Sequence, residues 1–183
     1  MTLTSKQRGV LRGVILGAAI AIAVLVATIV TKPISFSPEF SVGQRITFAL
    51  KVDLILAIWL VFSIGRLARH RFFTPEDIDG GGLTQGTEQA RVLQTTLQNT
   101  LEQTVFAVLV HMIWAVTMPL SWLATIPAAA VLFLAGRILF VRGYNRGAPS
   151  RALGFALTFY PSALMLVTAV VAVVTDMVIR LSV

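Results

Sequence analysis

The sequence predicts an all-α integral membrane protein, built from transmembrane helices that short loops connect. Hydrophobic residues make up 56% of the 183 residues and charged residues only 13%, about half of the ~25% typical of a soluble domain. The mean hydropathy is +0.84. A soluble chain of this size cannot hide so much apolar surface from water, and its uncharged runs are long enough to cross a bilayer. The composition therefore excludes a soluble globular domain, a disordered chain and a fibrous repeat.

The first two transmembrane helices are predicted in residues 13–30 and 46–64. The first run is uncharged and follows three basic residues, as the apolar part of a signal peptide does. It is long for that role and no small-residue cleavage site follows it, so we interpret it as a retained helix. The second run contains two charged residues, Lys51 and Asp53. The polar stretch at 66–91 is then the only sizeable loop that we expect.

Three more helices are predicted in the second half of the chain. Residues 103–136 carry no charge and are too many for a single crossing. Pro119 and Pro127 bracket a break in this run, which predicts a hairpin of two helices. The fourth helix is expected to end near Tyr144. A last uncharged run at 152–175 predicts the fifth helix.

Basic residues gather on one side of this five-helix arrangement. Ten Lys and Arg residues lie on the side of the N-terminus and three on the opposite side. Because cytoplasmic loops carry the excess of positive charge, we expect the N-terminus in the cytoplasm and the C-terminus outside. The net charge of +7 then has a topological cause and requires no nucleic-acid partner. The short loops and the Ala- and Val-rich composition favour a bacterial inner (plasma) membrane.

Several polar residues interrupt the apolar helices, where such residues are costly and usually face protein or water. Glu102 and Arg137 have two interpretations, a ligand site or a structural ion pair between neighbouring helices. Gln98 and Asn99 equally suit a ligand or a hydrogen bond across helices. A structural role is the preferred interpretation of the others: snorkelling to the surface for Lys51, a structural partner for Asp53 and an interior hydrogen bond for His111.

The chain contains no cysteine and only two histidines, His70 and His111. The lack of cysteine excludes a disulfide framework, a thiolate metal site and a cysteine nucleophile. Two imidazoles are too few for a conventional zinc or iron site, so we expect no metal.

Four segments together resemble the MAPEG family, the membrane-associated proteins in eicosanoid and glutathione metabolism. They are FTPED at 73–77, RVLQTTLQNTLE at 91–102, GRILFVRGYNRGAPSR at 136–151 and YPSALM at 160–165. The resemblance implies a MAPEG-like four-helix transmembrane bundle in residues 46–183, preceded by one extra N-terminal transmembrane helix and its loop in residues 1–45. It also implies a homotrimer in the lipid bilayer that binds glutathione between neighbouring subunits, near the cytoplasmic face.

The resemblance assigns roles to single residues of this sequence. Arg151 matches the arginine credited with stabilising the glutathione thiolate, and it is the expected catalytic residue. The other matches are glutathione-binding positions, namely Arg66, Gln98, Asn99, Glu102, Arg137 and Tyr144. Arginines suit the two carboxylates of glutathione, the Glu102 carboxylate suits its ammonium group, and a cation near sulfur lowers the pKa of the thiol.

Four positions depart from the pattern of particular branches of the family. Thr95 replaces an arginine, Phe140 a tyrosine, Ala152 a serine and Phe155 a tyrosine. The retained residues favour a glutathione transferase or peroxidase that acts on a lipophilic small-molecule substrate. The lost hydrogen-bond donors favour an alternative, a non-catalytic trimer that binds a lipid or a partner protein. A channel or transporter subunit is a third possibility, which only Lys51 and Asp53 suggest.

Overall fold

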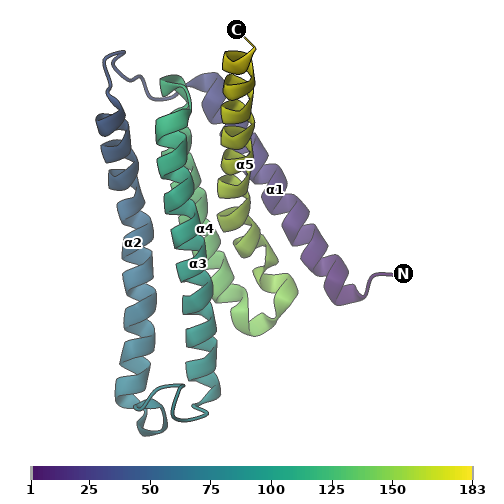
Figure 1. The fold of residues 1–183 in the computed structure, drawn as a ribbon. Coiled ribbons are helices and arrows are strands. Elements are labelled where there is room, and N and C mark those ends of the chain that lie inside the picture. The colour runs from purple at the N-terminus through teal and green to yellow at the C-terminus, as the bar shows by residue number, and fades with distance from the viewer. Residues whose placement is uncertain (1, 183) are drawn as a thin grey trace.

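The structure is a computed structural model in which residues 2–182 are described, and they form five long helices and no strand (Figure 1). The helices are α1 (Ser5–Thr31), α2 (Val42–Phe73), α3 (Glu88–Thr117), α4 (Thr125–Gly143) and α5 (Ala148–Leu181). Short 3-10 turns, η1 (Pro75–Asp77), η2 (Leu120–Trp122) and η3 (Tyr144–Arg146), lie between them. Each long helix is long and apolar enough to cross a membrane. The prediction of an all-α membrane protein is confirmed.

Helices α1, α2 and α3 begin where the sequence offers a side chain to cap them. Thr4 and Ser41 each accept a hydrogen bond from the backbone N–H three residues later, and Gln7 and Gln44 bond back to the cap. Thr87 caps α3 in the same way, through the N–H of Ala90. These side chains satisfy backbone donors that the first turn leaves without an intrahelical partner.

The polar loop is shorter than the sequence predicted. We expected residues 66–91 to be loop, but α2 continues to Phe73 and α3 already begins at Glu88. The difference arises because an apolar run marks only the part of a helix that crosses the membrane. Charged residues such as Arg66 and Arg91 favour helix as well as apolar ones do.

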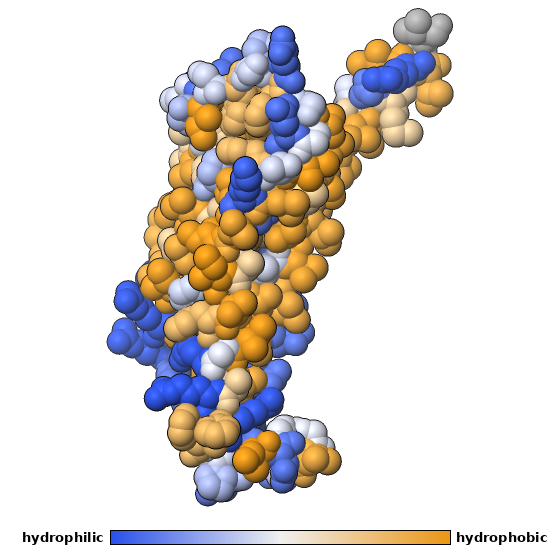
Figure 2. Space-filling model, turned by 90° about the vertical axis from the view of Figure 1, so that its left-hand side faces the viewer, coloured by the Kyte–Doolittle hydropathy of each residue, from blue (hydrophilic) through white to orange (hydrophobic). Residues whose placement is uncertain are grey.

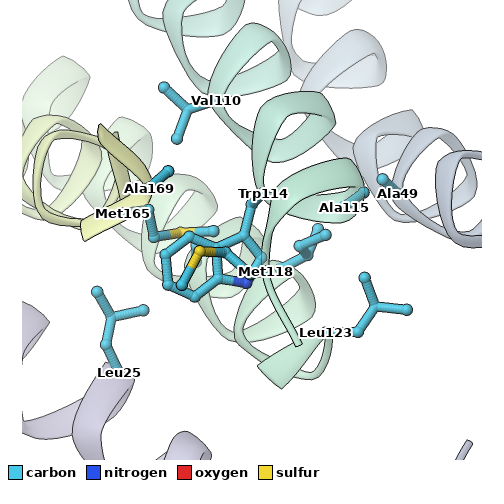
Figure 3. Close-up of a cluster of buried hydrophobic side chains, with 11 residues drawn as sticks. Leu25, Ala49, Val110, Trp114, Ala115, Met118, Leu123, Met165 and Ala169 are labelled. Carbon is cyan, nitrogen blue, oxygen red and sulfur yellow. The ribbon is translucent and has the colours of Figure 1, made fainter. Parts of the chain in front are cut away.

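The core lies where α3 meets the other helices, and Trp114 is at its centre (Figure 3). Leu25 of α1, Ala49 of α2 and Met165 of α5 belong to the same cluster, in which Ala49 lies beside Ala115 of α3. The indole N–H of Trp114 donates to the carbonyl oxygen of Trp122 at 3.1 Å, so the one polar atom of the ring is satisfied. The same cluster therefore holds α1, α2, α3 and α5 together.

A buried polar pair joins α2 to α3. The Asp53 Oδ1 atom lies 2.6 Å from Nδ1 of His111, and both side chains are buried. The expectations of a structural partner for Asp53 and an interior hydrogen bond for His111 are confirmed. Lys51, two residues before Asp53 in α2, is exposed.

The helices alternate in direction, so one end of the bundle collects the start of α1, the loop 74–87 and the turn η3, while the C-terminus lies at the other end (Figure 1). On the α2 side, apolar side chains cover the middle of the molecule and hydrophilic ones lie toward both its upper and its lower end (Figure 2). Exposed residues of α2 such as Leu54, Ile58 and Val61 contribute to the apolar surface. This distribution fits a protein that is integral to a membrane.

Candidate functional site

The turn between α4 and α5 brings Tyr144 and Arg151 together. The turn is tight because Gly147 adopts a positive φ of 92°, which a side chain would disfavour. Beyond the turn, α4 and α5 approach each other closely: a Cβ added to Gly136 of α4 would lie only 2.7 Å from the carbonyl oxygen of Gly154 in α5. As a result, the guanidinium carbon of Arg151 lies 4.3 Å from the centre of the Tyr144 ring.

Arg151 and Tyr144 face a groove of about 400 Å³ between α1, α3, α4 and α5. The polar residues of the groove are Thr95, Asn99, Tyr144 and Arg151. Its other walls are apolar and consist of Val10, Val14, Phe140, Ala148, Ala152 and Phe155. We refer to it as the Arg151 groove.

Arg137 lies behind the Arg151 groove and supports it. Its side chain is fully buried, and its Nη1 donates to Oδ1 of Asn99 at 2.9 Å while its Nη2 donates to the hydroxyl of Thr158 at 2.5 Å. The guanidinium also lies over the ring of Phe140, 4.7 Å from its centre. Arg137 therefore ties α3, α4 and α5 together and fixes the amide of Asn99, which lines the groove.

Gln98 and Glu102 lie on a different side of α3. The amide nitrogen of Gln98 donates to Glu102 Oε1 at 3.0 Å, and both side chains are exposed. Arg137 takes Asn99 and Thr158 as partners, so the structural ion pair between Glu102 and Arg137, one of the two interpretations above, does not form within the chain.

Arg66 is also separate from the Arg151 groove. Its guanidinium carbon lies 5.8 Å from the centre of the Phe62 ring on α2. It lines a second groove of about 360 Å³, together with Arg69, His70 and residues at the start of α3. Seven residues were expected at the glutathione site. Within a single chain, three of them, Asn99, Tyr144 and Arg151, line one groove, and Arg137 lies behind it.

A wider groove of about 580 Å³ opens between the loop 74–87 and the start of α3. Arg71, Arg91 and Gln94 line it, and it meets the Arg151 groove at Thr95. The Arg151 groove is therefore bordered by a polar, loop-side cavity on one side. Among residues 2–182, no three histidine or carboxylate side chains lie close enough to share a metal ion.

Asp77 anchors the loop that borders this wider groove. Its Oδ2 accepts from the hydroxyl of Thr87 at 2.6 Å and lies 2.8 Å from Nε2 of His70, and its Oδ1 accepts from the backbone N–H of Thr87 at 2.7 Å. The hydroxyl of Thr87, followed by its N–H and by His70, favours the charged carboxylate and lowers the pKa of Asp77. Thr87 is also the cap of α3, so one carboxylate connects the loop, the end of α2 and the start of α3.

Sequence reasoning missed two sets of residues at this site. Val10 and Val14 come from the extra helix, to which the sequence assigned no role, and they form one wall of the Arg151 groove. Thr158 accepts the second hydrogen bond of Arg137. A signal for the first set was present, because Gly9, Gly13 and Gly17 recur every four residues, a spacing that lets membrane helices approach closely.

Comparison with known proteins gives one match. The family model described as the MAPEG family matches residues 46–171, which begin in α2 and end in α5. No curated protein and no solved structure matches the chain. Helix α1 lies outside the matched residues.

Proposed function

The chain belongs to the MAPEG family, the membrane proteins of glutathione and eicosanoid metabolism, and from this premise we propose that it binds glutathione and acts as a glutathione transferase or peroxidase on lipophilic substrates. Glutathione occupies the Arg151 groove, and the substrate reaches it from the bilayer. Asn99, Tyr144 and Arg151 contact the bound tripeptide, and Arg137 positions Asn99.

The observation that carries the proposal is the position of Arg151. Its half-buried guanidinium lies against an aromatic ring in a groove with mostly apolar walls. Among residues 2–182, no carboxylate lies within ion-pair distance of it, although three pairs of that kind occur elsewhere. A cation with no internal partner, half-buried between apolar walls, interacts more strongly with an anionic ligand than a fully solvated cation does. Arg151 also lies in the first turn of α5, where the helix dipole favours negative charge.

This arrangement favours the thiolate form of a bound thiol. A guanidinium beside sulfur lowers the pKa of the thiol from its usual value of about 8.5, which raises the fraction of the nucleophilic form. In the transferase reaction, the sulfur electron pair forms a C–S bond and a leaving group departs with its own pair. In the peroxidase reaction, the thiolate attacks the outer hydroperoxide oxygen and yields an alcohol and a sulfenic acid. A second glutathione then converts the sulfenic acid to the disulfide and water.

A homotrimer supplies the remaining residues. Gln98 and Glu102 are exposed on a helix that crosses the membrane, and polar groups of this kind are costly when they face lipid. We propose that they face a neighbouring subunit, where Glu102 holds the ammonium group of glutathione. Arg66 lies outside the Arg151 groove of its own chain, so we propose that it reaches the groove of a neighbour.

One observation favours the alternative, a non-catalytic trimer that binds a lipid or a partner. Phe140, Ala152 and Phe155, the positions at which the sequence departs from hydroxyl-bearing branches of the family, all line the Arg151 groove. The groove therefore offers few hydroxyl donors to an oxygen or sulfur that develops charge, and it offers more apolar surface to a lipid.

Glutathione binding to the purified protein in mild detergent distinguishes the proposed enzyme from the non-catalytic trimer. Calorimetry measures binding, and the ultraviolet difference spectrum measures thiolate. We expect the wild type to bind glutathione and to show thiolate, and Arg151→Ala to lose the thiolate signal with a much smaller loss of affinity. The matched control is Arg146→Ala, because Arg146 is an exposed arginine in the turn η3, just before α5. This variant should bind glutathione and show thiolate as the wild type does.

Each other outcome has a definite meaning. Binding without a thiolate signal in the wild type contradicts a catalytic role for Arg151. An equal loss of affinity and thiolate in Arg151→Ala makes this residue a carboxylate clamp. Absence of binding at millimolar glutathione, in protein that remains folded and oligomeric, supports the non-catalytic trimer.

A further inference from the structure

We infer that α1, the helix outside the family match, forms a binding site for the aliphatic tail of the lipophilic substrate. The inference rests on the proposed function and adds to it the part of the molecule that recognises the substrate. Three features carry it, namely the close contact of α1 with α5, the position of Val10 and Val14, and an apolar groove on the other side of these two valines.

Helix α1 lies unusually close to the first turns of α5. A Cβ added to Gly9 would be 2.9 Å from Cβ of Pro149, and one added to Gly13 would be 2.9 Å from Cβ of Ala152. Real Cβ atoms do not approach so closely, so only glycine permits this spacing. The contact places the N-terminal half of α1 directly beside Arg151, which belongs to the same turn of α5 as Ala152.

Two of the side chains on this half of α1 reach the site. Val10 and Val14 are one helical turn apart and share a face of the helix. Both line the Arg151 groove, together with the α3 residues Thr95 and Asn99. Helix α1 therefore contributes part of the apolar lining of the groove.

An apolar groove of about 440 Å³ lies on the other side of the same valines. Val10, Val14 and Ala148 line both this groove and the Arg151 groove, so the two grooves share one wall. Leu3 and Leu11 complete the apolar lining, and Lys6 and Gln7 are its only polar residues among those described. We refer to it as the α1 groove.

The occupant that fits this arrangement is an aliphatic chain attached to the reacting centre. Glutathione, with two carboxylates and an ammonium group, has no complement in an apolar groove, but an alkyl tail from the bilayer finds apolar side chains to pack against there. The polar groove at the loop and the α1 groove border the Arg151 groove at Thr95 and at Val10 and Val14, respectively. The α1 groove shares no lining residue with the groove at the loop, so the alkyl tail and the tripeptide can occupy different parts of the site.

The absence of cysteine from the chain provides a direct test. We would introduce one thiol at a time, as V10C, V14C or L16C, and follow its labelling by a neutral alkylmaleimide. L16C is the matched control, because Leu16 is exposed on α1 and lies about 200° around the helix from Val14. Two ligands without a free thiol compete with the label: S-methylglutathione, which has no tail, and S-decylglutathione, which carries an alkyl chain on its sulfur.

We expect S-decylglutathione to slow the labelling of V10C and V14C much more than S-methylglutathione does, when both ligands are at equal occupancy. At a ligand concentration of ten times Kd the rate should fall by about tenfold, because about nine sites in ten are occupied. The labelling of L16C should not change with either ligand. As a second variant, Leu11→Trp, at a position that lines the α1 groove but not the Arg151 groove, should weaken the binding of S-decylglutathione several-fold and leave that of S-methylglutathione unchanged, and Leu16→Trp should affect neither.

Calorimetry on the wild type separates the failure of this inference from the failure of the proposed function. If both ligands bind the wild type but protect V10C and V14C equally, or not at all, the tail does not lie against α1 and the inference is wrong. If neither ligand binds the folded wild type, the proposed function is wrong, and the inferred tail site on α1 is then wrong as well.

Discussion

At the scale of single residues, Arg137 has an unusual environment for a cation in a membrane helix. It is fully buried, and its two partners are a neutral amide and a neutral hydroxyl. Its Nε atom has no hydrogen-bond partner among residues 2–182. Burial of a charge is costly unless the charge is well compensated, so each of the two hydrogen bonds contributes strongly. Arg137 therefore fixes the amide of Asn99, which is what the positioning role proposed for it requires.

The hydrogen bond between Arg137 and Thr158 can be tested by Thr158→Val, which removes the hydroxyl and keeps the shape. We expect the free energy of unfolding in detergent to fall by about 2 kcal/mol, because hydrogen bonds to charged groups are stronger than neutral ones. Thr168→Val is the control. Thr168 is exposed on the same helix and donates only to its own backbone, at the carbonyl oxygen of Leu164, so its change should stay within about 0.5 kcal/mol. Equal losses in both variants would contradict a special role for Thr158.

The Asp53–His111 pair predicts a graded response to substitution. Asp53→Ala leaves the buried imidazole without its partner, and we expect a loss of about 3 kcal/mol in the free energy of unfolding. Asp53→Asn keeps an oxygen that accepts from His111, so it should cost about 1 kcal/mol. Lys51→Ala, at an exposed position of the same helix, should have little effect. If Asp53→Asn instead abolished an ion flux in liposomes without any loss of stability, the pair would belong to a conduction path.

At the scale of elements, the loop 74–87 depends on the charge of Asp77. Its hydrogen bond from Thr87 lowers the pKa of the carboxyl in the folded state. The carboxylate therefore stabilises the loop fully at pH values above the unfolded pKa of about 3.9. This contribution is lost as the pH falls from that value through the lower pKa of the folded state.

Hydrogen exchange at the amide of Thr87, which donates to Asp77, reports this dependence. After correction for the intrinsic effect of pH, we expect protection to be constant from pH 7 to about pH 4 and to decrease below it. Asp77→Asn should lower the protection at neutral pH and remove the acid transition. Asp79→Asn, at an exposed position of the same loop, should retain the wild-type profile. Protection that begins to fall well above pH 4 would contradict the role of the Asp77 carboxylate.

The packing of α1 on α5 depends on glycine at three positions of one helix face. A Cβ at Gly17 would clash with the side chain of Ala156, so Gly17→Leu should push the two helices apart. We expect a loss of about 2 kcal/mol, as is typical of overpacking, and faster hydrogen exchange in α1 than in α3. Gly65→Leu is the control, because a Cβ at Gly65 would meet nothing within 4 Å. Unchanged exchange in α1 of the Gly17→Leu variant would show that the close contact is dispensable.

The sequence predicted the number of helices well because an uncharged run of sufficient length has few structural alternatives in a chain this apolar. It did not predict the ends of α2 and α3, since helix continues into polar residues beyond the membrane. It named Tyr144 and Arg151 only through the resemblance to the family, and the structure shows that a short turn brings the two together. The contacts of Arg137 with Thr158 and of α1 with α5 join residues distant in sequence, and local patterns do not determine such contacts.

At the scale of the whole molecule, the single chain leaves polar side chains exposed on a membrane helix. It also divides the proposed glutathione-binding residues between two separate grooves. Gln98 and Glu102 are exposed on α3, and Arg66 lines a groove other than that of Arg151. A cyclic assembly resolves both features, because each subunit then completes the site of its neighbour. The assembly therefore predicts that Arg66 and Arg151 of one site come from two different chains.

Mixed oligomers of two inactive variants test this prediction. Arg66→Ala and Arg151→Ala should each lack the glutathione thiolate signal. When both chains carry different tags and are co-purified as mixed trimers, every cyclic arrangement contains one site with both arginines. About one third of the wild-type signal should therefore return. A mixture of wild-type chains with the double variant Arg66→Ala/Arg151→Ala controls for expression and exchange, and the mass of the complex in detergent measures the number of subunits. If Arg66 and Arg151 act within one chain, no arrangement of the two single variants restores a complete site, so the mixed trimers would remain without signal while the control retains it.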